Sequence, residues 1–217
     1  IADSFPVSAQ IGFVAIIVAL LIGIPLGVIA ALKRGGVADM LSMTLATVGI
    51  SIPTFVIAML LMYAFCMEWA ILPTHGWGEL KHFILPVACL CLAPVANITR
   101  LTRSTLMEVV QQDYIRTARS KGLSEFTVVG KHAMRNAIVP VVTYLGPLVA
   151  GLMTGSFAIE RIFMVPGIGR YFVNSVSDRD YTMIMGVTIF YGLFIMICTL
   201  IVDIAYALID PRVRLDS

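Results

Sequence analysis

The sequence predicts an all-α protein, a polytopic bundle of transmembrane helices. Apolar residues make up 59% of the 217 residues and charged residues only 13%, whereas a typical soluble domain carries about 25% charged residues. The charges are also segregated, which leaves five uncharged stretches: Phe5–Leu32, Met40–Met67, Phe83–Thr99, Asn136–Ile159 and Tyr181–Val202. A helix needs about 20 apolar residues to cross the hydrocarbon core of a bilayer. Five such stretches in one chain favour membrane spans over buried core helices.

We place the spans, in a single domain 1–217, at residues 9–32, 40–66, 82–100, 137–158 and 183–208. The first span is too long for a cleaved signal peptide, has no basic residue before it and ends in Leu32-Lys33-Arg34 instead of small residues. The third is the shortest, and Arg100 and Arg103 can extend it because long basic side chains reach the membrane surface from within a span.

The distribution of basic residues predicts the orientation. If the spans alternate, 11 of the 15 Lys and Arg residues lie in loops on one side, and only Lys81, Arg161, Arg170 and Arg179 lie on the other. The positive-inside rule places the basic side in the cytoplasm. Ile1 is then outside, and because the chain begins without an initiating Met, we expect a native helix before it and six spans in all.

The loop of residues 103–135 carries the strongest local pattern. Residues 111–121 have the pattern of a helix with Tyr114, Ile115 and Ala118 on one face. Gly122 suits a left-handed C-terminal cap, and Ser124 suits the N-cap of a second helix. The loop is therefore expected to be a helical hairpin. On these residues alone, a solvated basic hairpin near anionic lipid headgroups is an equal alternative.

A family resemblance bears on this choice. The segment DYIRTARSKGLS (residues 113–124), followed by HAMRNAIVP (132–140), resembles the conserved cytoplasmic loop of binding-protein-dependent ABC importers, and most of all the oligopeptide, dipeptide and nickel permease family. Further motifs follow in order along the chain: GIPLG (23–27), SIPTF (51–55), LPTHG (72–76), RLTRS (100–104), ERIF (160–163), PGIG (166–169), RDY (179–181) and DPRVR (210–214). Arg116-Thr117-Ala118 replaces the Glu-Ala-Ala of the wider superfamily, which fits the peptide and nickel branch.

The resemblance implies a type I ABC importer permease fold in the inner membrane of a bacterium or archaeon. Such a permease forms half of the pathway of an ATP-driven importer, here for oligopeptides or dipeptides, with nickel or another small solute as the alternative. Its expected partners are a homologous second permease subunit, two ATPase subunits and an extracytoplasmic substrate-binding protein, with membrane lipid around it and no nucleic acid. The chain is expected to bind no cofactor and to catalyse no reaction. ATP and Mg²⁺ belong to the ATPase subunits, since no GxxxxGK[ST] phosphate loop occurs in the sequence.

In this family the loop couples the permease to the ATPase. The coupling residues that the resemblance implies are Asp113, Tyr114, Ile115, Arg116, Thr117, Ala118, Arg119, Lys121, Gly122 and Leu123. We expect Ile115, Ala118 and Leu123 to supply the apolar contact with the ATPase, and the basic residues to form its polar rim.

The external loop, residues 158–182, is a second candidate site. Glu160, Arg161, Arg179 and Asp180 are expected to form a gate or a contact for the binding protein, the alternative being surface ion pairs beside a short helix at 170–176. Asp203 in the last span is a candidate gate residue, although a structural ion pair or helix cap is the favoured interpretation.

Other classes of site find less support in the sequence. His75, Glu79 and His82 have a spacing that could bind a metal, but Gly76 and Gly78 break any helix between them, so we predict no metal site. A secondary transporter would show an internal repeat and several ionisable residues in its spans, and the sequence shows no repeat and only Asp203. An intramembrane protease would need a histidine base in a span beside a nucleophile such as Ser156, and none lies there.

Overall fold

The computed structural model describes residues 2–209, with the side chains of all of them except Asp203 and residues 205–209. Within this range the chain is helical, with turns and short loops between the helices. The elements are α1 (Phe5–Leu32), α2 (Val37–Ser51), α3 (Thr54–Met62), η1 (Tyr63–Glu68), α4 (Leu80–Val109), α5 (Asp113–Ser120), α6 (Glu125–Thr127), η2 (Val128–Ala133), α7 (Met134–Ala137), α8 (Val139–Met153), α9 (Phe157–Ile162), α10 (Ile168–Asp178) and α11 (Tyr181–Ile209).

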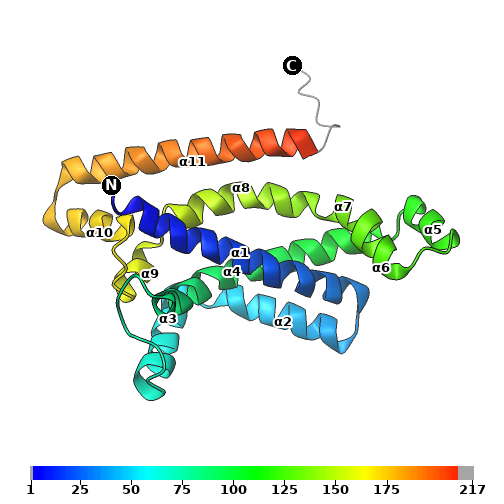
Figure 1. Ribbon diagram of the computed structural model, residues 1–217, viewed down its shortest axis with the longest axis horizontal. Helices are drawn as coiled ribbons and strands as arrows, with labels where there is room; N and C mark the ends of the chain where they lie inside the picture. Colours follow the sequence, from blue (N-terminus) through cyan, green and yellow to red (C-terminus); the bar gives the residue numbers. More distant parts are fainter. Residues whose placement is uncertain (1, 210–217) are drawn as a thin grey trace.

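The centre of the bundle is the pair α1 and α4, which run side by side in Figure 1. Small residues recur every four positions along α1, at Ala15, Ala19, Gly23 and Gly27, and all four are buried. A Cβ atom added at Gly23 would lie 2.9 Å from the Cβ of Ile98 on α4. Such a stripe of small residues lets two helix backbones approach closely, which is how helices commonly pack in membranes.

Four long segments are apolar enough to cross a membrane: Phe5–Leu32, Leu80–Val109, Val139–Ile162 and Tyr181–Val202. The segment predicted as one span over residues 40–66 differs, because it is divided into α2 and α3–η1, which meet at 98°. The break lies at Ile52-Pro53, where both residues are extended. Proline has no N–H to donate and disfavours a helical conformation in the residue before it, so a helix ends there readily.

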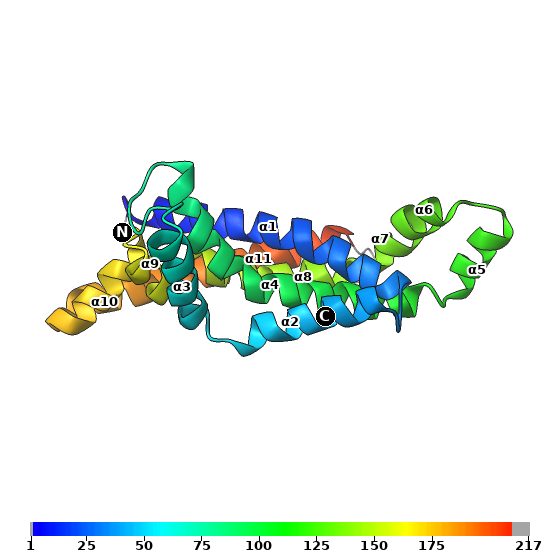
Figure 2. The ribbon, with the colours of Figure 1, turned by 90° about the horizontal axis from the view of Figure 1, so that it is seen from below.

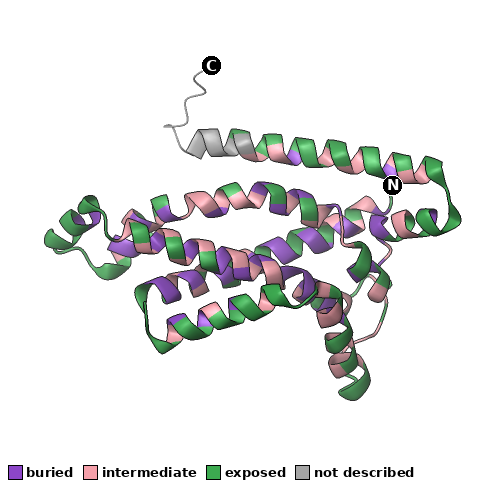
Figure 3. Cartoon of the chain, turned by 180° about the vertical axis from the view of Figure 1, so that it is seen from behind, coloured by how far each residue is buried: buried purple, intermediate pink, exposed green. Residues whose placement is uncertain are grey.

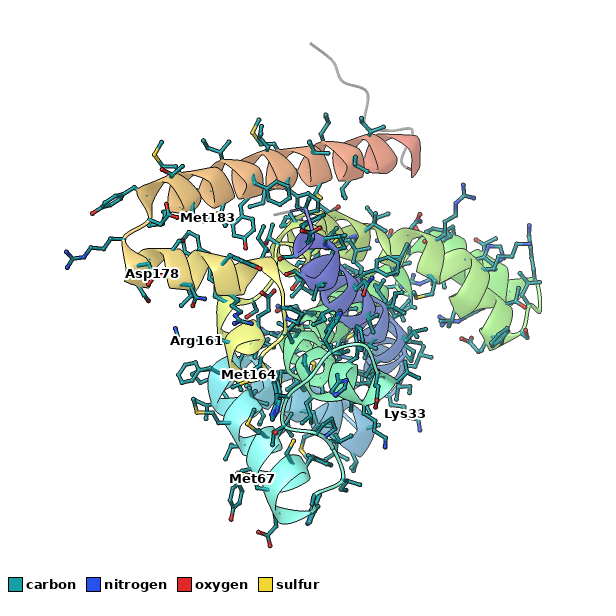
Figure 4. The ribbon with its side chains drawn as sticks, turned by 60° about the vertical axis from the view of Figure 1, so that its left-hand side comes forward. Lys33, Met67, Arg161, Met164, Asp178 and Met183 are labelled. Atoms are coloured by element: carbon teal, nitrogen blue, oxygen red, sulfur yellow. The ribbon has the colours of Figure 1, made fainter. Side chains whose placement is uncertain are left out.

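The arm formed by α3 and η1 projects away from the bundle, and Met67 lies near its tip (Figure 4). On the opposite side of the core, α11 packs mainly against α8 and exposes most of its apolar side chains (Figure 3).

Helix α4 continues beyond the predicted limit at residue 100, and a partly buried ion pair accompanies the extension. The Nε and Nη2 groups of Arg103 donate to the two carboxylate oxygens of Asp39 at 2.6 and 2.8 Å. Asp39 also accepts a hydrogen bond from the backbone N–H of Gly35 at 2.9 Å. This bidentate pair holds the start of α2 against α4.

The molecule has two functional ends, which Figure 2 shows far apart. One end carries the α1–α2 turn and the segment of residues 110–138, which we call the loop hairpin. The other carries α9, α10 and the loop of residues 69–79, and we call it the opposite end.

Candidate functional site: the loop hairpin, the groove and the opposite end

The loop hairpin folds as its sequence predicts. Helix α5 ends at Ser120 with Lys121 as its C-cap, and the next residue, Gly122, adopts a positive φ of +75°. Ser124 is the N-cap of the next helix, and its Oγ accepts a hydrogen bond of 3.4 Å from the backbone N–H of Thr127. Because each helix is stopped or started by local chemistry, the turn between them is sharp and defined.

Side-chain contacts connect the parts of the loop hairpin. The Nε of Arg119 donates to Glu125 Oε1 at 2.7 Å, which joins α5 to α6. The hydrogen bond between these side chains lowers the pKa of the Glu125 carboxyl and raises the pKa of Arg119. At the base of the hairpin, Asn136 Nδ2 donates to the hydroxyl of Tyr114 at 2.8 Å. The hairpin is therefore attached to itself at both its tip and its base.

The apolar face of α5 points into the protein, which corrects one expectation. Ile115 is fully buried and Ala118 is 8% exposed, in a cluster with Leu106 of α4 and Val128 of η2. We expected Ile115 and Ala118 to contact the ATPase, but their surface is already used in packing the hairpin onto the bundle. They position the hairpin instead.

The outward surface of the hairpin is basic and carries exposed apolar side chains. Phe126 is 88% exposed and Leu123 40% exposed. Arg116 and Lys121 are also exposed. Sequence reasoning missed Phe126, because no local pattern distinguishes it: η2 buries Val128, Val129 and Ala133 and α6 buries no residue, yet Phe126 and Val129 have the i, i+3 spacing of one helix face.

A groove of about 590 Å³ lies on the bundle beside the opposite end, where α9 forms part of its wall. Its wall includes Leu90 and Pro94 of α4, Tyr144 of α8 and Ser156 in the turn after α8. Asn97 Nδ2 donates to the Tyr144 hydroxyl at 3.1 Å and fixes its position. The residues that line the groove carry no charge, and most are apolar or small.

The candidates at the opposite end divide into buried and exposed residues. Glu160 is only 3% exposed and accepts hydrogen bonds from Ser8 and Gly169, so the expectation that it offers a surface to a binding protein is wrong. Arg161, Arg179 and Asp180 are exposed. Asp180 Oδ1 also caps α11 by accepting a hydrogen bond from the N–H of Met183 at 3.0 Å. The side chain of Asp203 lies outside the described residues.

His75, in the loop before α4, and His82, in the first turn of α4, both have structural contacts. His82 Nδ1 accepts a hydrogen bond of 3.2 Å from the N–H of Glu79, and the Glu79 side chain accepts one from the N–H of His82. This reciprocal pair is a capping box that starts α4. His75 Nδ1 is 2.7 Å from the hydroxyl of Thr74. Among the described side chains, no three His, Cys, Asp or Glu are grouped as metal ligands would be.

A bundle of long apolar helices that carries a basic helical hairpin at one end is the architecture of a polytopic membrane protein. Comparison with known proteins gives its family. The family profile described as "Binding-protein-dependent transport system inner membrane component" matches residues 23–215. The chain belongs to this family, and it is a permease subunit of an ABC importer.

Curated relatives match nearly the whole chain. The dipeptide transport system permease protein DppB of Bacillus subtilis (strain 168) is 52% identical over 211 residues, which cover 97% of this chain and 68% of that protein. The oligopeptide transport system permease protein OppB of Salmonella typhimurium (strain LT2) is 44% identical over 216 residues, which cover 99% of this chain and 71% of that protein.

Solved structures share the fold at low identity. A structure of the MetNI methionine ABC transporter in an inward-facing conformation has a TM-score of 0.80 at 15% identity, with 96% of this chain and 95% of that chain covered. An amino acid ABC transporter solved with histidines has a TM-score of 0.71 at 16% identity, with 92% and 89% covered. The type I ABC importer permease fold that the sequence predicted is therefore confirmed.

Proposed function

We propose that the chain is one half of the translocation pathway of an ATP-driven importer of short peptides. The observation that carries the substrate class is the 52% identity, over 97% of this chain, to a protein named as a dipeptide permease. The groove supports it on physical grounds. Peptides share a backbone but differ in the charge of their side chains, and a wall without charged groups does not select among them.

The proposed assembly pairs this chain with a homologous second permease, two ATPase subunits and an extracytoplasmic substrate-binding protein, in the inner membrane of a bacterium or archaeon. The chain binds no cofactor itself, and ATP with Mg²⁺ is bound by the ATPase subunits. The loop hairpin faces the cytoplasm and contacts an ATPase subunit. Its fixed turn and its internal hydrogen bonds support this role, because only a rigid element transmits a displacement without absorbing it.

The contact surface that we propose is the outward one. Phe126 and Leu123 supply the apolar part, and Arg116 and Lys121 the polar rim. Large aromatic side chains at the centre of a contact commonly account for much of its binding energy.

The experiment is uptake by the complete assembly in membrane vesicles. We expect uptake of labelled dipeptides or oligopeptides that requires ATP and the binding protein, and that a hundredfold excess of Ni²⁺ does not compete away. The purified chain alone should hydrolyse no ATP above background. Uptake without ATP, or uptake of nickel in place of peptide, would contradict the proposal.

A further inference from the structure

One buried acidic side chain, that of Glu160, takes no part in the proposed role of the loop hairpin. Glu160 lies at the opposite end and is 3% exposed. Within the described residues its carboxylate forms no ion pair. A buried charge without a cation needs strong hydrogen-bond donors to offset its lost hydration.

The donors come from two other helices. Ser8 Oγ, on α1, donates to Glu160 Oε1 at 2.7 Å, and the backbone N–H of Gly169, on α10, donates to Oε2 at 2.8 Å. Ser8 Oγ also accepts a hydrogen bond of 2.9 Å from the N–H of Ile168. The carboxylate therefore closes a network that joins α1, α9 and α10.

Three nearby glycines leave space for this carboxylate. A Cβ atom added at Gly155 or Gly167 would collide with a carboxylate oxygen of Glu160, and one added at Gly169 would lie 2.8 Å from Oε2. The glycines of the turn after α8 and of the PGIG motif thus leave a space that the Glu160 side chain fills together with Ser8 and Phe157.

This network lies directly behind the wall of the groove. Gly155, Ser156, Phe157 and Ala158 line the groove, and Glu160 follows two residues later on the same short helix. The Phe157 ring stacks on Phe172 of α10, with ring centroids 4.8 Å apart. The same segment therefore lines the groove on one side and contacts the Glu160 carboxylate and the Phe172 ring on the other.

We propose that Glu160 is a positioning residue of the transport pathway. Its carboxylate fastens the groove-lining turn, Gly155 to Ala158, to α1 and α10, so that the opposite end moves as one body when the pathway opens and closes. This inference rests on the proposed function, because it assigns a transport role to the wall of the groove.

The test compares Glu160→Ala with Glu160→Gln in the complete assembly. Alanine leaves the Gly169 N–H and the Ser8 hydroxyl without their acceptor. Glutamine keeps the bond to Gly169, because its amide oxygen can accept from that N–H, and it replaces the bond from Ser8 by one of opposite direction, in which its NH₂ donates to Ser8 Oγ. The control is Asp178→Ala, which removes an exposed carboxylate at the same end (Figure 4).

At equal membrane level we expect peptide uptake and binding-protein-stimulated ATP hydrolysis to fall about tenfold or more in Glu160→Ala, because unpartnered buried groups are costly. Basal ATP hydrolysis should stay unchanged, and Glu160→Gln and Asp178→Ala should stay within about threefold of the parent protein. In a background with Ser156→Cys and without the native cysteines, Glu160→Ala should speed labelling of the new thiol and Glu160→Gln should not.

Two results overturn the proposal. One is uptake by Glu160→Ala equal to that of the parent protein at equal membrane level. The other is a loss of uptake only in proportion to the protein that reaches the membrane, which would make the role one of folding alone. If Glu160→Ala does not assemble, Ser8→Ala is the milder variant and the same outcomes apply to it. If the parent protein imports no peptide, the proposed function fails, while the labelling at residue 156 still decides the role of Glu160.

Discussion

Gly122 offers the sharpest test of the loop hairpin. Its φ of +75° belongs to the left-handed region, and a Cβ atom added there meets nothing within 4 Å. The cost of Gly122→Val is therefore conformational only, about 1–2 kcal/mol for a left-handed L-residue and somewhat more for a β-branched one. A shift of that size changes a population by a factor of about 5–30. We expect association with the ATPase subunits, and uptake with it, to fall by this factor at unchanged membrane level.

The chain contains a matched control for this substitution. Gly35, in the turn between α1 and α2, has a φ of +73° and likewise no neighbour within 4 Å of an added Cβ. Gly35→Val thus imposes the same backbone cost outside the hairpin and should leave ATPase association intact. Asparagine tolerates the left-handed region, so Gly122→Asn should lie between the parent protein and Gly122→Val. Co-purified ATPase per permease is the measurement, and equal retention by Gly122→Val and Gly35→Val would refute the coupling role.

Three further predictions follow from the two ends of the molecule. Phe126→Ala should weaken ATPase association about tenfold or more, and Leu80→Ala, which removes an 86% exposed side chain at the opposite end, should not; equal effects of the two changes would argue against a contact at Phe126. Arg119 lowers the pKa of Glu125, so the ion pair is intact above the usual pKa range of a carboxyl and is lost only as pH falls through the lowered pKa. ATPase association should therefore not change between about pH 8 and pH 5. A titration of ATPase association with a midpoint in that window would argue against a role for the pair. In a cysteine-free background, new cysteines at Gly35 and Ser124, at the hairpin end, should resist an impermeant external thiol reagent. New cysteines at Gly78 and Ser177, at the opposite end, should react with it. Labelling of the hairpin end from outside would reverse the orientation.

Local chemistry was the part of the fold that the sequence predicted best. The stop at Gly122 and the start at Ser124 each depend on a residue and its near neighbours, and both are present in the structure. The long apolar helices were predictable for the same reason, since hydrophobicity and length suffice to recognise them. The sharp bend at Pro53 was not predicted, because proline inside an apolar run produces either a mild kink or a complete break.

Contacts between distant residues could not be predicted in this way. The apolar face at Ile115 and Ala118 was recognised, but an amphipathic helix can bury that face in its own protein or in a partner. Glu160 was assigned to the surface because the sequence around it is rich in charges. Its burial depends on Ser8, which is 152 residues away in the chain and gives no local sign of this contact.

That separation along the chain also determines when these contacts can form during synthesis of the protein. Ser8 lies in the first helix described here, and its partners at Glu160 and Ile168 are synthesised 152 and 160 residues later. The contacts of that hydroxyl with Glu160 and Ile168 therefore cannot form until most of the chain has been translated. The network at the opposite end is thus among the last long-range contacts to form.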